Sequence, residues 1–131
     1  MTTTISIRQD RTIGDVQRDF AQAYPFLKID FYKINGKAKY TTAEKLDKLV
    51  LMRSCNLLRE GELIVGDIMT VLELERSFRE NFGLYVQVSR KSGTLWLETT
   101  MTDNWTLKQQ NDHGRELSEP LPKVEDEIDY S

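Results

Sequence analysis

Basic residues flank two short turns of this chain, and aromatic residues lie on the segments that adjoin those turns. The turns are the dipeptides Asn35-Gly36 and Ser92-Gly93. The basic residues are Lys33, Lys37, Lys39, Arg90 and Lys91, and the aromatic residues are Tyr32, Tyr40, Tyr85 and Trp96. Basic turns beside aromatic strands can hold phosphates and stack bases. The same residues also suit a structural role, in which lysines protect strand edges and aromatic rings border the core.

Catalytic machinery is not evident in the sequence. His113 is the only histidine and Cys55 is the only cysteine, and no second base or nucleophile is placed near either by the sequence. A zinc site needs about four ligands, which one cysteine and one histidine do not supply. No glycine-rich phosphate loop or nucleophile elbow occurs. The sequence therefore predicts a protein that is not an enzyme and that needs no metal or cofactor.

The charge distribution limits the choice of partner. The chain of 131 residues carries a formal net charge of −3. Six acidic and two basic residues lie between Arg115 and Ser131, so this stretch carries −4 and the rest of the chain is close to +1. A dedicated nucleic-acid-binding domain usually has a clear basic excess. We therefore expect a protein-interaction module with a protein partner, and nucleic-acid binding through the two basic turns is the alternative.

A helical pattern occurs twice, 58 residues apart. Residues 12–24 and 70–82 share a threonine start, an acid three residues later, and apolar residues at helical spacing. The apolar residues are Ile13, Val16, Phe20 and Tyr24 in the first segment, and Val71, Leu74, Phe78 and Phe82 in the second. Pro25 and Gly83 follow as stops. Matching starts, stops and following turns indicate an internal duplication.

Alternating apolar residues predict the strands on either side of these helices. Residues 5–7, 27–32, 63–65 and 84–88 show the two-residue period, and 37–40 and 94–99 would be return strands after the turns. The predicted fold class is α+β. Two tandem β-α-β-β units would form a mixed sheet with two main helices on one face, an order that resembles a ferredoxin-like layout.

Three segments complete the predicted organisation. Residues 41–53 start like a helix, although the run 49–52 equally fits a buried strand. A third helix is expected at about 103–112, with Trp105 as its anchor and Gly114 at its end. Residues 1–116 would form one domain from repeats of about 1–58 and 59–116. Residues 117–131 would be an acidic, flexible tail.

The sequence resembles an uncharacterised family of small cytosolic bacterial proteins. The resemblance rests on four stretches: the opening Thr-Ile-Ser-Ile-Arg, Phe-Leu-Lys-Ile at 26–29, Arg-Lys-Ser-Gly at 90–93, and Trp-Leu-Glu-Thr-Thr at 96–100. It implies a bacterial, cytosolic protein and supplies no site. A single cysteine suits a reducing cytoplasm, and neither a signal peptide nor a membrane-spanning run is expected. The oligomeric state is left open.

Overall fold

Strands and helices alternate along the chain in the computed structural model, which describes residues 1–35 and 42–119. The strands are β1 (Thr2–Ile7), β2 (Leu27–Asn35), β3 (Thr42–Lys45), β4 (Gly61–Gly66), β5 (Tyr85–Ser92) and β6 (Leu95–Glu98). The helices are α1 (Ile13–Ala23), α2 (Val71–Phe82) and α3 (Leu107–Ser118), with 3₁₀ turns η1 (Met52–Ser54) and η2 (Thr100–Thr102). The predicted α+β class is confirmed.

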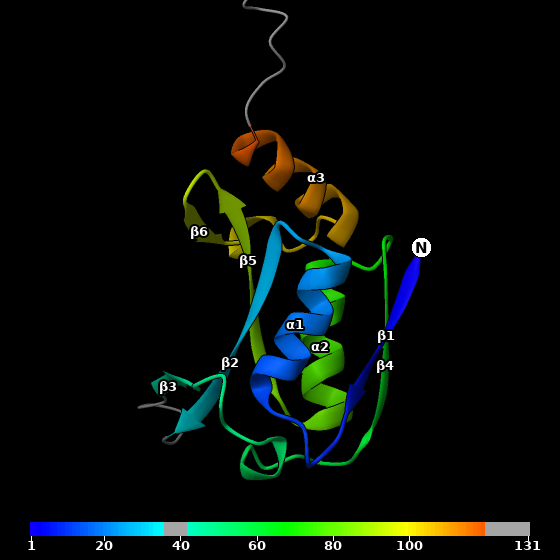
Figure 1. Ribbon diagram of the computed structural model, residues 1–131, viewed down its shortest axis with the longest axis vertical. Helices are drawn as coiled ribbons and strands as arrows, with labels where there is room; N and C mark the ends of the chain where they lie inside the picture. The colour runs from blue at the N-terminus through cyan, green and yellow to red at the C-terminus, as the bar shows by residue number, and fades with distance from the viewer. Residues whose placement is uncertain (36–41, 120–131) are drawn as a thin grey trace, which may run out of the picture.

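The strands form two antiparallel sheets. One sheet has the order β3-β2-β5-β6, and the other is the two-stranded ribbon β1-β4. We expected one mixed sheet from the order of the elements. Instead, all the described pairings are antiparallel. The first strand of each half pairs with the other, as β1 with β4, and the second strands, β2 and β5, pair in the other sheet. β1 and β2 therefore lie in different sheets, on opposite sides of α1 (Figure 1).

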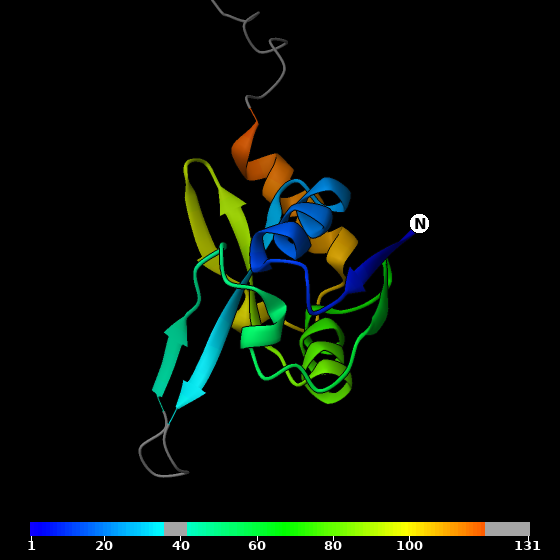
Figure 2. The ribbon, with the colours of Figure 1, turned by 60° about the horizontal axis from the view of Figure 1, so that its bottom comes forward.

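The core lies between the four-stranded sheet, the two main helices and the ribbon (Figures 1 and 2). The predicted apolar stripes of α1 and α2 are buried, as are the sheet residues that face them. The Phe31 ring of β2 meets the Phe78 ring of α2 edge to face, with centroids 5.6 Å apart. Both helices cover one face of the four-stranded sheet, and the other face is left uncovered by the described elements.

Reciprocal hydrogen bonds define the starts of both main helices. The Thr12 side chain accepts from the Asp15 amide at 3.1 Å, and the Asp15 carboxylate accepts from the Thr12 amide at 3.0 Å. Thr70 and Glu73 exchange the same two bonds. Gly83 ends α2 with φ of +71°, a conformation that favours glycine. The predicted starts and stops of these helices are thus confirmed.

The third helix differs from its expected limits. α3 begins after Thr106, whose side chain accepts from the Gln109 amide, and it continues to Ser118. The prediction that Gly114 ends the helix is wrong, because Gly114 lies buried within it. A Cβ at this position would lie 2.9 Å from the Cβ of Phe26, so glycine permits a close approach here and does not mark a helix end.

The segment after the first hairpin is not a helix as expected. Residues 42–45 form β3 and residues 52–54 form the turn η1. The run 49–52 lies beside the start of α1, where the Val50 carbonyl accepts from Ile13 and the Met52 amide donates to Arg11. These bonds keep the backbone of residues 49–51 out of a helical conformation. The expected return strand at 37–40 and the tail from Pro120 onward lie outside the described residues.

Equivalent backbone hydrogen bonds occur in the two halves. The Ile13 amide donates to Val50, and the Val71 amide, 58 residues on, donates to Trp105. Three further bonds correspond, each written from the donor amide to the acceptor carbonyl. Gly14–Lys48 matches Leu72–Asp103, Met52–Arg11 matches Leu107–Met69, and Arg53–Gln9 matches Lys108–Asp67. The segment before η1 therefore occupies, in the first half, the place of the segment before α3 in the second.

Candidate functional site

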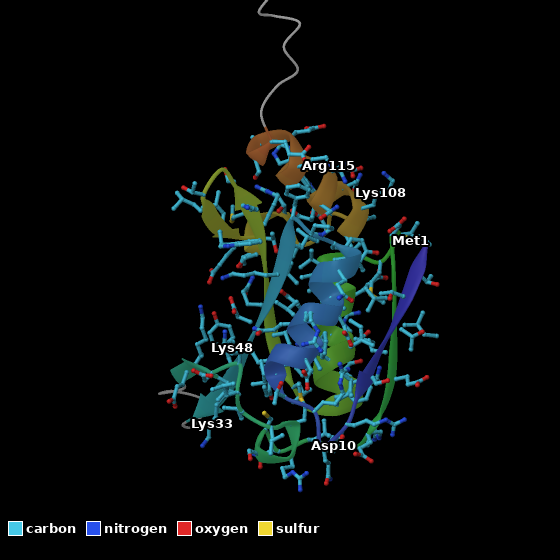
Figure 3. All side chains as sticks on the ribbon, viewed as in Figure 1. Met1, Asp10, Lys33, Lys48, Lys108 and Arg115 are labelled. Atoms are coloured by element: carbon cyan, nitrogen blue, oxygen red, sulfur yellow. The ribbon has the colours of Figure 1, made fainter. Side chains whose placement is uncertain are left out.

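The two basic turns lie at opposite ends of the four-stranded sheet. β2 and β5 run antiparallel, with Leu27 opposite Arg90 and Tyr32 opposite Tyr85, so the end of β2 lies far from the end of β5. Figure 3 places Lys33 at the end of the molecule away from α3. The structure therefore does not bring Lys33 together with Arg90 and Lys91 in one site. Lys37 and Lys39 lie outside the described residues.

Arg90 belongs to a polar link between β5 and α3. Its Nη1 donates to Gln110 Oε1 at 2.7 Å, and its guanidinium lies 5.7 Å from the centroid of the Trp105 ring. Gln110 is completely buried, and its amide nitrogen donates to the carbonyl and the hydroxyl of Thr102. These contacts give Arg90 a structural role beneath α3, away from the uncovered face.

The uncovered face of the sheet collects three aromatic side chains. Residues opposite each other in an antiparallel pair point to the same face. The register therefore places Tyr32 beside Tyr85 on the two central strands and Lys91 beside Trp96 on β5 and β6. Leu27 and Ile29 of β2 are buried on the opposite face. The structure thus places Lys91 and Trp96, two of the predicted residues, on the same face as the tyrosine pair but toward the other end of β5.

Charges of both signs lie among these rings. The Lys28 ammonium lies 5.2 Å from the centroid of the Trp96 ring and 3.7 Å from the Asp30 carboxylate. Lys45 of β3 approaches the same carboxylate to 3.6 Å. Both ion pairs are partly exposed and contribute little to stability. The two ion pairs orient the side chains of Lys28 and Lys45, because they hold both ammonium groups beside the aromatic rings.

A shallow depression of about 340 Å³ lies at the tyrosine pair. Ile34, Ala43, Val86, Gln87 and Glu98 line it together with Tyr32 and Tyr85. Burial raises the pKa of the Tyr32 hydroxyl, and nearby Asp30 and Glu98 raise it further against the opposing effect of Lys45. The Tyr32 hydroxyl therefore stays protonated at neutral pH and can donate a hydrogen bond.

Strand β6 forms an exposed edge of this sheet. Leu95, Trp96 and Leu97 are 64%, 39% and 43% exposed. The Thr99 amide donates to Val88 of β5. Because backbone groups alternate along an antiparallel strand, the amides and carbonyls of Trp96 and Glu98 point to the open side. An exposed apolar edge with free backbone groups readily accepts another strand.

Sequence reasoning did not select Lys28, Lys45, Leu95 or Leu97. The polar residues that alternate with buried ones in β2 were a usable signal for Lys28. The position of Lys45 depends on the pairing of β3 with β2, which was not predicted because residues 41–53 resembled a helix start. Leu95 and Leu97 read as part of an ordinary buried strand, since the sequence pattern does not reveal that β6 is an edge.

His113 and Cys55 lie in separate parts of the molecule. His113 of α3 lies 3.6 Å from the Glu116 carboxylate, and its ring packs edge-on against Trp105. Cys55 follows η1, and burial raises the pKa of its thiol, which disfavours the reactive thiolate. Within residues 1–35 and 42–119 no three His, Cys, Asp or Glu side chains gather as metal ligands would.

Comparisons with protein-family models, with curated proteins and with solved structures find no significant match to this chain. Among the described helices, none is long and apolar enough to cross a membrane. The case for function therefore rests on the geometry of the uncovered face and its edge.

Proposed function

We propose that this protein is a non-enzymatic protein-interaction module that binds an extended segment of a partner along β6. The observation that carries this proposal is the uncovered sheet face with Trp96, Tyr85 and Tyr32, which ends in an exposed apolar edge strand. Main-chain hydrogen bonds to the outward groups of Trp96 and Glu98 would supply affinity, and side-chain contacts would supply specificity.

The side chains around β6 suit such a partner. Tryptophan and tyrosine provide large contact areas at low entropic cost and are enriched among residues that dominate interface energetics. Leu95 and Leu97 would be buried by an added strand on one face, and Trp96 on the other. The mixed charges of Lys28, Asp30 and Glu98 fit a polar rim better than a continuous anionic ligand.

The test separates the backbone of β6 from its side chains. Replacing Glu98 by proline removes an amide that points to the open edge and leaves the bonds to β5 in place, whereas Glu98→Ala removes only the side chain. We expect the immobilised chain to retain a stoichiometric partner from native cytosol, and purified partner to bind the Glu98→Pro variant at least roughly tenfold more weakly than Glu98→Ala.

Two results would contradict the proposal. One is the absence of any stoichiometric partner, and the other is equal binding by the proline and alanine variants. Trp96→Ala should also weaken binding, whereas Leu72→Ala on the exposed side of α2 is the matched control for loss of an apolar surface residue. Thermal unfolding of each variant shows whether the fold is intact.

Nucleic-acid binding is the second candidate. Adjacent aromatic rings on the central strands of an uncovered antiparallel sheet can stack unpaired bases. Tyr32 and Tyr85 have this arrangement, and Lys28 and Lys91 lie within the same face. Separation of the two basic turns and the presence of Asp30 weigh against it. A titration of single-stranded DNA and RNA at low salt that shows no binding at micromolar protein would rule it out.

We also infer that the two halves arose by duplication and that the protein is cytosolic. The repeated hydrogen bonds at the starts of α1 and α2 support the first inference. An unpaired cysteine supports the second, together with the resemblance to a cytosolic bacterial family.

A further inference from the structure

One end of the four-stranded sheet is covered by α3. There the Phe26 amide donates to Asn111 Oδ1 at 2.8 Å, and Arg90 donates to Gln110. The backbone of α3 approaches Phe26 closely at Gly114. The beginning of β2 and the end of β5 thus form a seat for a helix.

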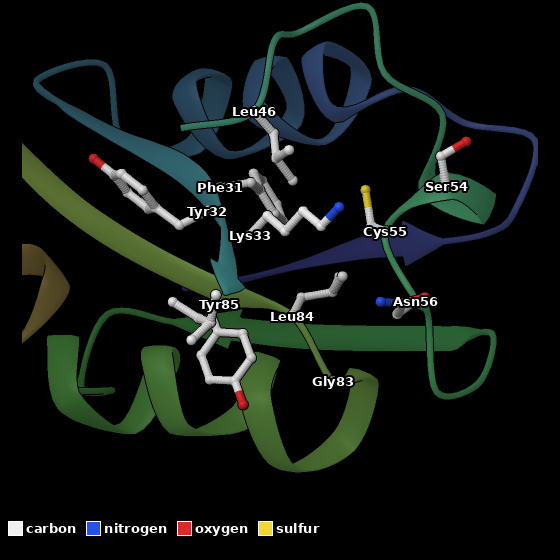
Figure 4. A pocket seen from close by; sticks show the side chains of 11 residues that line it. Phe31, Tyr32, Lys33, Leu46, Ser54, Cys55, Asn56, Gly83, Leu84 and Tyr85 are labelled. Carbon is white, nitrogen blue, oxygen red and sulfur yellow. The ribbon is translucent and has the colours of Figure 1, made fainter. Parts of the chain in front are cut away.

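The opposite end of the sheet is formed by the same two strands, where the end of β2 meets the beginning of β5 and Tyr32 lies opposite Tyr85. Both residues line a pocket of about 190 Å³ together with Phe31, Lys33, Leu46, Ser54, Cys55, Leu84 and other residues (Figure 4). The pocket is therefore the counterpart of the seat that α3 fills.

The chain does not fill this second seat with a helix of its own. The turn η1 has only three residues, and Asn56 follows with φ of +57° and directs the chain away. The Leu58 amide then donates to the Phe82 carbonyl at 2.9 Å, which holds the linker beside the end of α2. A helix that continued from η1, as α3 continues in the second half, would run along the pocket.

The pocket combines an apolar floor with a single cation. Phe31 and Leu84 are buried beneath it and Leu46 packs at its side. Lys33 is the only charged residue that lines it, and its side chain extends across the pocket toward Cys55 (Figure 4). Among the described residues Lys33 forms no ion pair, and Glu44 of β3 lies opposite it in the ladder outside the pocket lining. The volume is comparable to a cavity of about 150 Å³ that holds benzene.

We propose that this pocket binds a helix of a protein partner, which inserts one large apolar side chain and directs a carboxylate to Lys33. The apolar floor and the volume select the side chain, and the cation in the pocket lining selects the charge. The helical form follows from α3, which occupies the equivalent seat at the other end of the same sheet. The pocket contains no residue of β6, and this proposal does not depend on the function proposed for that edge.

The experiment uses the full chain and two helical peptides of about 15 residues. Each peptide carries one phenylalanine, with either glutamate or lysine about four residues away, one helical turn along. Binding is followed through the backbone amide chemical shifts of the protein. We expect both peptides to perturb Ser54, Cys55 and Leu84, and the glutamate peptide to bind roughly tenfold more tightly, as one charge-assisted hydrogen bond would provide.

Substitution of the cation supplies the matched control. Lys33→Gln should reduce the ratio of the two affinities to about one, whereas Lys91→Gln, near the end of β5 on the uncovered face, should leave it unchanged. Equal affinities in the native chain, no shifts at millimolar peptide, or shifts elsewhere would overturn the proposal. Free N-acetylphenylalanine that matched the glutamate peptide in affinity would identify a small-acid site and overturn helix docking. Glu98→Pro should not affect this binding, so the two proposals fail independently.

Discussion

Gly114 offers a sharp test of how α3 packs on the sheet. In an open helix, replacing glycine by alanine stabilises a protein by about 1 kcal/mol. At Gly114, however, the new Cβ would lie 2.9 Å from Phe26 Cβ and 3.1 Å from both the Phe26 carbonyl oxygen and Arg90 Cγ. A backbone oxygen cannot rotate away as the end of a flexible side chain can. The helix must therefore move outward.

The size of the effect follows from what that movement disrupts. Overpacking costs about 1 to 3 kcal/mol. The displaced helix also weakens the bonds from Phe26 to Asn111 and from Arg90 to Gln110, each worth about 1 kcal/mol. After the helix-propensity gain of about 1 kcal/mol is subtracted, we expect Gly114→Ala to lower the free energy of unfolding by about 1 to 3 kcal/mol.

Urea unfolding measures this change, with tryptophan fluorescence and far-UV circular dichroism as two probes. The pair Glu116→Ala and Glu116→Gly calibrates the propensity difference at an exposed position of the same helix. The slope of free energy against urea should be unchanged, so that the midpoint alone reports stability. If Gly114→Ala stabilised the protein by as much as alanine gains over glycine at position 116, the close approach to Phe26 would be refuted.

Three further substitutions test other contacts by the same measurement. Gln110→Ala should cost about 2 to 3 kcal/mol, because it leaves buried partners of this side chain without hydrogen bonds. Tyr24→Phe should cost about 1 kcal/mol by removing the bond from the Tyr24 hydroxyl to Asp67, and no loss would contradict that bond. Burial raises the pKa of Glu75, which accepts from the Val88 amide. The contribution of protonated Glu75 to the free energy of unfolding is therefore complete below the unfolded-state pKa and is lost as pH rises through the folded-state pKa. Glu75→Gln should consequently gain stability relative to the native chain as pH rises, and a pH-independent difference would contradict this.

Local patterns were sufficient for the two main helices. Phe20 and Phe78 lie on apolar stripes with the helical period, and the threonines at positions 12 and 70 satisfy free amides within three residues. These features depend on neighbours in sequence, so they could be read without knowledge of the tertiary fold. Strands β1, β2, β4, β5 and β6 were found for the same reason, because alternation is also local, whereas the sequence of β3 resembles a helix start.

Strand partners could not be read in that way. The pairing of Ile5 with Leu63 joins residues 58 positions apart, and the alternation pattern fits a parallel or an antiparallel neighbour equally well. Gly114 was misread because a glycine needed for close packing looks the same as one that ends a helix. The candidate face was missed as a unit, since the proximity of Lys28 to Trp96 depends on the register of three strands.

The differences between the two halves point to where function lies. At the end of β5, Arg90 is held beneath α3 by Gln110, whereas at the end of β2 Phe31 and Tyr32 border an open pocket. The divergence follows from the third helical segment, which is long in one half and ends after η1 in the other. A seat retained in the sheet without its helix keeps buried residues such as Leu84 next to an accessible pocket. The open pocket forgoes the packing that α3 supplies at the other end of the sheet, and the leucines of β6 stay exposed, which is the physical reason to look for a partner at both the pocket and the β6 edge.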